Sequence, residues 1–98
     1  MEKTTIKKTR NDGVINVGKK PNMAYVTACI LQLSSGVKKL TIQSRGHSIS
    51  KAVDVAEILR NRFRKDVKIK NIKIGTQEME TEDKNKINIS TIAIELTV

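Results

Sequence analysis

The chain has 98 residues, a length that suits one domain and leaves no room for a second hydrophobic core. Its 19 Lys and Arg residues outnumber its 10 Asp and Glu residues, and the resulting net charge of +9 is typical of a protein with a polyanionic partner. Aromatic residues make up only 2% of the chain, too few for the stacking platforms of most single-strand binders, so contact with the backbone of a duplex is favoured.

Other features of the whole chain bear on the compartment. The single cysteine, Cys29, has no partner within the chain, which suits a reducing environment. No apolar stretch is long enough to cross a membrane, and the basic N-terminus lacks the apolar segment of a secretory signal. We therefore expect a cytoplasmic protein with no membrane partner.

The first part of the chain predicts a tail, a strand and a helix. Residues 1–12 are polar and basic and are expected to be a flexible tail, followed by one folded domain over residues 13–98. A short strand at 14–17 precedes a helix whose first residue is predicted to be Pro21. Apolar residues at helical spacing mark the buried face of this helix: Met23, Val26, Ile30 and Leu33.

The middle of the chain repeats this strand-and-helix pattern. A strand is predicted over 37–43, with Leu40 and Ile42 on one face. Ser48 or Ser50 is expected to cap the helix that follows. The apolar face of that helix is predicted to consist of Ile49, Ala52, Val53, Ala56, Leu59 and Phe63.

Two longer strands close the chain. The alternating patterns over 67–74 and 87–96 both slip by one residue, which indicates a bulge or a strong twist in a paired hairpin. The polar stretch at 75–86 between them predicts a protruding arm. The sequence thus predicts an α/β fold: a single two-layer domain of order β-α-β-α-β-β, with a four-stranded mixed sheet and both helices on one face.

Both predicted helices start next to positive charge. Gly18-Lys19-Lys20-Pro21 precedes the first helix and Arg45-Gly46-His47-Ser48 precedes the second. Cations are mildly unfavourable there because a helix N-terminus already carries partial positive charge, whereas a phosphate would be bound well. Crossovers between parallel strands would bring both starts to the same sheet edge and so create one basic surface.

Two of these segments resemble the motifs of a known family. Residues 18–26 (GKKPNMAYV) resemble the opening motif of the Alba family of archaeal chromatin proteins, and residues 45–54 (RGHSISKAVD) resemble its second motif, continued by residues 57–63. Residues 75–77 look like the family's turn into the hairpin arm, and the resemblance extends from about Val14 to Val98.

The resemblance implies a homodimer that coats double-stranded DNA, often also binds RNA, and associates dimer to dimer through the position of Phe63. It places the Lys19-Lys20 loop and the Arg45 loop on the DNA backbone and the two hairpin arms towards flanking minor grooves. Eukaryotic relatives belong to RNase P-type ribonucleoproteins. The nucleic-acid contacts that we predict are Lys19, Lys20, Asn22, Arg45, His47, Lys51, Arg60, Lys84 and Lys86.

The sequence departs from the family pattern in two places. His47 stands where the second motif commonly has Arg, so a fixed charge becomes one that titrates near pH 6.5 in an unperturbed imidazole, and binding should depend on pH. Over residues 76–86 of the arm, four acids outnumber two lysines. We therefore expect the arm to contribute less to affinity than the body of the protein.

Patterns typical of enzymes and metal sites fail on chemistry. Residues 13–20 approach a phosphate-binding loop but lack the Ser or Thr that would hold Mg²⁺. Residues 48–51 spell S-x-x-K without the motifs that accompany it in acylating enzymes. His47 has neither thiol nor second histidine nearby. We expect no enzyme activity, no cofactor and no metal.

The function predicted from the sequence is non-enzymatic binding of double-stranded DNA with little sequence readout, for chromatin organisation and compaction in the nucleoid. The alternative is an RNA-binding protein, either a ribonucleoprotein subunit or an RNA chaperone. Acetylation of Lys19 or Lys20 would remove a phosphate contact and could regulate binding.

Overall fold

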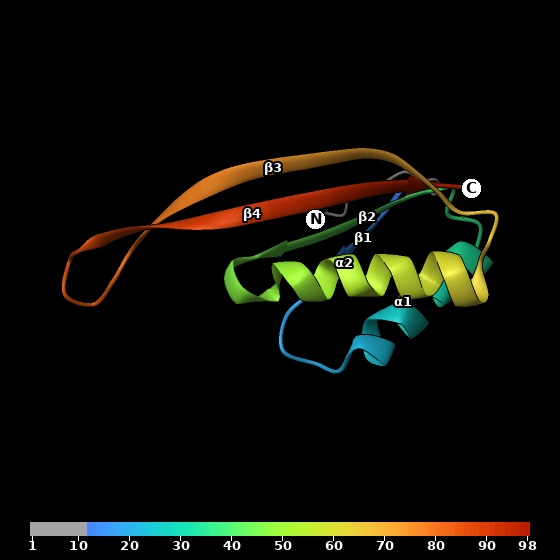
Figure 1. The fold of residues 1–98 in the computed structure, drawn as a ribbon, viewed down its shortest axis with the longest axis horizontal. Coiled ribbons are helices and arrows are strands. Elements are labelled where there is room, and N and C mark those ends of the chain that lie inside the picture. The colour runs from blue at the N-terminus through green and yellow to red at the C-terminus, as the bar shows by residue number, and fades with distance from the viewer. Residues whose placement is uncertain (1–11) are drawn as a thin grey trace, which may run out of the picture.

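Two helices cover one face of a four-stranded sheet in the computed structural model, which describes residues 12–98 (Figure 1). In chain order the elements are β1 (Asp12–Asn16), α1 (Asn22–Ser34), β2 (Lys39–Arg45), a 3-10 turn (η1, Gly46–Ser48), α2 (Ile49–Ile58), a π-helical turn (η2, Leu59–Phe63), β3 (Lys68–Glu80) and β4 (Lys86–Thr97). The predicted β-α-β-α-β-β order is confirmed. The tail predicted over residues 1–12 lies outside the described residues, except for Asp12, which begins β1.

The strands are ordered β1-β2-β4-β3 across the sheet. β1 pairs with β2 in parallel, whereas β4 is antiparallel to both of its neighbours, β2 and β3, so the predicted mixed sheet is confirmed. β2 and β3 therefore run in the same direction. Each helix connects two parallel strands, and the carboxyl ends of β1 and β2 meet at one edge of the sheet.

The core lies between the sheet and the helices. Its buried apolar residues are Ile15, Val17, Val26, Cys29, Leu33, Leu40, Ile42, Ala52, Val55, Ala56, Leu59, Val67, Ile94 and Leu96. The predicted inward direction of Leu40 and Ile42 is confirmed. In α1 the buried face passes through Cys29, whereas Met23 is about half exposed, so the prediction of Met23 as a core residue is wrong. The face is rotated towards Cys29, which leaves Met23 at its margin in the first helical turn.

The buried face of α2 also differs from the predicted one. Val55 is fully buried, whereas Val53 and Phe63 are exposed by 42% and 47%. Phe63 leaves the buried face because the helix widens to a π-helical turn, in which the Arg64 N–H donates to the carbonyl oxygen of Leu59 at 2.8 Å. This wider turn displaces the residues after Leu59 from the α-helical register on which the prediction relied.

The starts of both helices differ slightly from the predicted ones. Pro21 precedes the first helical residue of α1 rather than occupying that position. The side chain of Ser48 makes no capping hydrogen bond, so the predicted serine cap of α2 is wrong. Instead η1 leads directly into α2, and the Ile49 N–H donates to the carbonyl oxygen of Gly46.

The predicted irregularity in the last two strands occurs in β3 alone. The pairing with β4 shifts between Ile69 and Asn71, which makes Lys70 the extra residue of a β-bulge. The bulge keeps Ile69 and Ile72 on the same sheet face and so explains the slip in the pattern. β4 is paired along its length without a bulge. The slip in its alternating sequence pattern therefore means that its apolar side chains lie on one sheet face in the arm and on the other face in the core.

The hairpin of β3 and β4 extends beyond the rest of the sheet. The last pair between β2 and β4 is Arg45 with Thr91, so the stretch of β4 before Thr91 pairs only with β3. Figure 1 shows this twisted arm projecting from the edge at which β2 ends. The predicted protruding hairpin is confirmed.

Candidate nucleic-acid interface

The two basic segments lie at the same edge of the sheet. β1 and β2 are in parallel register, with Asn16 opposite Gln43, so the chain leaves both strands side by side. The loop after β1 carries Lys19 and Lys20, and η1 after β2 carries His47; all three residues are exposed. Figure 1 shows both helix starts at this end of the molecule and both helix ends at the other. We call this region, with the first turn of α2, the basic edge.

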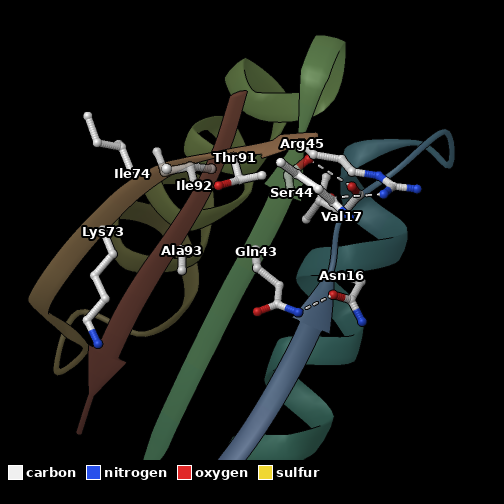
Figure 2. A pocket seen from close by; sticks show the side chains of 12 residues that line it. Asn16, Val17, Gln43, Ser44, Arg45, Lys73, Ile74, Thr91, Ile92 and Ala93 are labelled. Atoms are coloured by element: carbon white, nitrogen blue, oxygen red, sulfur yellow. Dashed lines mark hydrogen bonds between the residues drawn. The ribbon is translucent and has the colours of Figure 1, made fainter. Parts of the chain in front are cut away.

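The loop that carries Lys19 and Lys20 is held where it leaves β1. The Val17 N–H donates to the carbonyl oxygen of Gln43 at 2.8 Å, and the Ser44 hydroxyl donates to the carbonyl oxygen of Val17 at 2.9 Å (Figure 2). The Gln43 side-chain amide also donates to Oδ1 of Asn16 at 2.6 Å. β1 therefore remains tied to β2 up to the start of the loop.

Tyr25 fixes the same loop from the opposite side. Its hydroxyl oxygen accepts hydrogen bonds from the backbone N–H of Gly18 at 2.9 Å and of Lys20 at 3.0 Å. Partial burial acts to raise the pKa of this hydroxyl, but the two backbone hydrogen bonds and the charges of Lys51 and Lys20 outweigh it and lower the pKa. The two hydrogen bonds hold the loop after β1 against the first turns of α1.

Neither helix neutralises the positive charge at its start. The first turns of α1 and α2 contain no acidic residue. Asn22, the first residue of α1, and Lys51, in the first turn of α2, are both half-buried at this edge. The backbone N–H groups of the two helix starts and the surrounding cations thus point an electropositive surface at the solvent.

Arg45 lies on the sheet face that the helices leave uncovered. Its Nη1 donates to Oε1 of Gln77 at 3.1 Å and lies 3.8 Å from Sδ of Met79, so the guanidinium reaches across β4 to the arm. It borders a hollow of about 550 Å³ in this face, whose other sides are formed by Gln43, Lys73 and neighbouring residues (Figure 2). The structure therefore places Arg45 between the basic edge and the arm.

The arm carries the predicted contacts Lys84 and Lys86 at and beside its tip. Lys84 has a positive φ of 65°, and its N–H donates to the carbonyl oxygen of Thr81 at 2.9 Å within the turn. The acidic side chains of the arm are exposed: Glu78, Glu80, Glu82 and Asp83. The two lysines are thus separated from the basic edge and surrounded by negative charge.

Arg60 and Phe63 lie at the opposite end of α2 from the basic edge (Figure 1). Arg60 forms an ion pair of 2.6 Å with Glu57, and its Nε is buried without a hydrogen-bond partner among residues 12–98. Phe63 is 47% exposed, so it is a surface residue and not part of the core. The structure does not bring either residue together with Lys19 and Lys20.

The described part of the chain contains no group of three or more His, Cys, Asp or Glu residues that could hold a metal ion. Between residues 12 and 98, no helix is both long and apolar enough to cross a membrane.

Tyr25 is a residue of the basic edge that the sequence analysis did not single out. Tyr25 lies seven residues after Gly18, near the start of α1. This position was the available signal, since a long side chain near the start of a helix can fold back over the preceding loop and bond to its backbone.

Comparison with known proteins gives consistent matches. The family model described as Alba matches residues 13–76. The protein named DNA/RNA-binding protein Alba from Methanocella arvoryzae is 51% identical over 83 residues, 85% of this chain and 86% of the relative. Its namesake from Methanothrix thermoacetophila is 49% identical over 85 residues, 87% of this chain and 94% of the relative.

Solved structures agree with these matches. Alba from Thermoplasma volcanium has a TM-score of 0.82 at 44% identity, with 87% of this chain and 99% of that chain covered. ALBA1 from Trypanosoma brucei has a TM-score of 0.67 at 25% identity, with 93% of this chain and 71% of that chain covered.

Proposed function

This chain belongs to the Alba family of non-enzymatic nucleic-acid-binding proteins, and we propose that it binds double-stranded DNA through the phosphate backbone to organise and compact the chromosome. The observation that carries the proposal is the basic edge, where Lys19, Lys20 and His47 stand exposed at two helix starts without an acid in either first turn. The relatives' name, DNA/RNA-binding protein Alba, supports the choice of ligand.

The proposed contacts are electrostatic. Lys19, Lys20 and Lys51 would bind successive phosphates, Asn22 would donate from the start of α1, and Arg45 would extend the contact towards the arm. Phosphate contacts position a protein without reading sequence, so little sequence preference follows. Acetylation of Lys19 or Lys20 would remove one positive charge and weaken binding, which makes these lysines proposed sites of regulation.

We further propose that the protein acts as a homodimer. Ile74 and Ile72 of β3 are exposed by 83% and 52%, on the sheet face that the helices only partly cover. Ile49 of α2 lines a groove with Ile74 and Ile92, and Val53, one helical turn further on, is exposed on the same side of α2. A second copy using the same patch would bury these side chains in a two-fold interface.

The dimer is tested by the Ile74→Glu variant. Its mass by light scattering should fall to that of a monomer, because the charge would be buried in the interface, while its circular dichroism stays unchanged. Ile87→Glu is the matched control, since Ile87 is an exposed isoleucine of the arm. A dimeric Ile74→Glu protein would exclude this interface. Phe63, at the far end of α2, is the proposed contact between neighbouring dimers on DNA.

DNA binding is tested by fluorescence anisotropy with a 30-base-pair duplex of DNA, and with the matching RNA duplex, over a series of salt concentrations. The Lys19→Ala/Lys20→Ala variant should bind DNA more weakly, and its salt slope should fall by about 0.9 for each lost phosphate contact. Lys38→Ala/Lys68→Ala is the control of equal charge. Both residues are exposed, Lys38 just before β2 and Lys68 at the start of β3, and both strands start at the sheet edge opposite the basic edge.

RNA binding is the second candidate function, and the name of the relatives supports it. Tighter binding to the RNA duplex than to the DNA duplex would favour a ribonucleoprotein subunit or RNA chaperone over a chromatin protein. Salt-independent or absent binding to both duplexes would overturn the proposed function altogether.

A further inference from the structure

We infer that the hydroxyl of Tyr25 is itself a phosphate ligand of the basic edge, and donates its proton to a backbone oxygen of the bound nucleic acid. The inference rests on the proposed function. It adds a hydrogen bond from an uncharged hydroxyl to the lysine–phosphate contacts already proposed. It differs from a purely structural role, in which Tyr25 would only hold the loop that carries Lys19 and Lys20.

The hydrogen bonds around Tyr25 determine which part of its hydroxyl remains for a ligand. The oxygen accepts from the Gly18 N–H at 2.9 Å and from the Lys20 N–H at 3.0 Å. A phenol has one proton to donate, and its oxygen accepts no more than two such bonds. No residue between 12 and 98 accepts the proton. Within residues 12–98 the hydroxyl oxygen therefore accepts two hydrogen bonds, and its proton is donated to no residue.

The surroundings of the hydroxyl favour an anionic acceptor. Lys20 follows the loop residue Lys19 and donates its backbone N–H to the hydroxyl oxygen, and the first turn of neither helix contains an acidic residue. The charges of Lys51 and Lys20 act to lower the pKa of Tyr25. A phosphate oxygen that accepts from this hydroxyl would lie beside the loop that carries Lys19 and Lys20, whose side chains are both exposed. A donor bonded to a charged oxygen forms a shorter and stronger hydrogen bond than one bonded to a neutral acceptor.

The two accepted bonds also fix the direction of the donor in advance. Because the backbone at Gly18 and Lys20 determines where the oxygen lies, little rotational freedom remains to be lost when a phosphate binds. The same two bonds connect the donor to the backbone of the loop that carries Lys19 and Lys20.

A double-mutant cycle separates direct contact from loop positioning. DNA affinity is measured for the wild type, Tyr25→Phe, Lys19→Ala/Lys20→Ala and the triple variant, at a salt concentration low enough for all four to bind. Direct contact predicts that Tyr25→Phe weakens binding about tenfold both in the wild type and in the background that lacks the two lysines. It also predicts an unchanged salt slope for Tyr25→Phe, since no cation is lost.

If Tyr25→Phe has no effect once Lys19 and Lys20 are absent, the hydroxyl only positions the lysines and the inference is overturned, while the proposed function stands. If the wild type shows no salt-dependent DNA binding, both fail together. Circular dichroism and amide spectra of Tyr25→Phe verify that its fold is intact.

A second measurement reports on the proton directly. Tyr25 is the only tyrosine of the chain, so incorporation of 3-fluorotyrosine gives one fluorine signal for this hydroxyl. Donation to a phosphate requires the proton, and the DNA duplex should therefore raise the pH at which the signal titrates by about one unit or more. Only the protonated phenol can donate to a phosphate, so a donated bond must stabilise the protonated form in the complex. A titration midpoint that is the same with and without DNA would therefore overturn the inference.

Discussion

The guanidinium of Arg45 donates a hydrogen bond of 3.1 Å to the side-chain oxygen of Gln77, which is 32 residues further along the chain. Arg45 is the last residue of β2, and Gln77 lies in the part of β3 that belongs to the arm. The bond therefore crosses β4 and connects the basic edge to the base of the arm. A residue expected to bind the DNA backbone is thus also a link between two parts of the protein.

This link predicts different results for its two members. Arg45→Ala should lower DNA affinity and reduce the salt slope by about 0.9, because a cation is lost. Gln77→Ala should leave the salt slope unchanged and increase the mobility of the arm in nitrogen-15 relaxation measurements. Since both side chains are exposed, the free energy of unfolding should change by less than about 0.5 kcal/mol in either variant. An arm of unchanged mobility in Gln77→Ala would show that this bond does not restrain it.

His47 predicts that binding depends on pH. It is exposed in η1 on the basic edge, where a protonated imidazole would add one positive charge. DNA affinity should be higher at pH 5.5 than at pH 8, because a protonated imidazole adds a cation to the basic edge, and the salt slope at pH 8 should be lower by up to about 0.9. His47→Arg should bind at pH 8 as tightly as at pH 5.5. Equal wild-type affinity at both pH values would contradict this role.

The acidic arm predicts a gain of affinity on neutralisation. The variant Glu78→Gln/Glu80→Gln/Glu82→Gln/Asp83→Asn removes four exposed negative charges from the hairpin that projects from the sheet edge at which β2 ends. It should bind DNA several-fold more tightly at low salt, and the gain should shrink as salt screens the charges. Lys84→Ala/Lys86→Ala should cost less affinity than Lys19→Ala/Lys20→Ala. Weaker binding after neutralisation would mean that these carboxylates take part in recognition.

Cys29 predicts a loss of stability at alkaline pH. The thiol is fully buried, and burial raises its pKa to about 12. Because an unfolded thiol titrates near 8.5, this contribution to stability is complete below that pH and is lost as the pH rises towards 12. Urea denaturation at pH 7, 9 and 10 should show a decrease of up to about 1.4 kcal/mol for each pH unit above 8.5.

The control for Cys29 is Cys29→Ala, which leaves the titration of every other group in place. Its stability should be lower at pH 7, where a buried side chain has lost an atom, but should depend less on pH than that of the wild type. Identical pH dependence in the two proteins would contradict the assignment of this effect to the thiol.

Hydrophobic periodicity was sufficient to predict most of the fold. The alternation at Leu40 and Ile42 and the two helical patterns establish which elements form and in what order, because burial of one face is the dominant local signal. The errors arise where geometry departs from a regular repeat. Phe63 fits the α-helical spacing, yet the π-helical turn before it moves the ring to the surface, and no residue type marks such a turn in advance.

The candidate site was predictable in part, for a different reason. Lys19, Lys20 and His47 could be assigned to one edge because parallel crossovers bring successive helix starts together. The roles of Tyr25 and Gln77 depend on hydrogen bonds across 7 and 32 residues of sequence, and only the folded geometry determines such pairs. Charge and topology are therefore visible in the sequence, whereas the contacts that orient the charged groups are not.

The arm continues two neighbouring strands of the sheet, the inner strand β4 and the edge strand β3. β4 is hydrogen-bonded on both sides from Thr91 to its end and on one side only before Thr91. In mechanical terms it is a cantilever, clamped in the core and free at its tip. A load applied at the tip would bend the hairpin near Thr91, where support from β2 ends, and would reach the sheet through both the inner strand β4 and the edge strand β3. The stiffness of the arm is therefore set by the core of the domain, and not by the few residues of its turn.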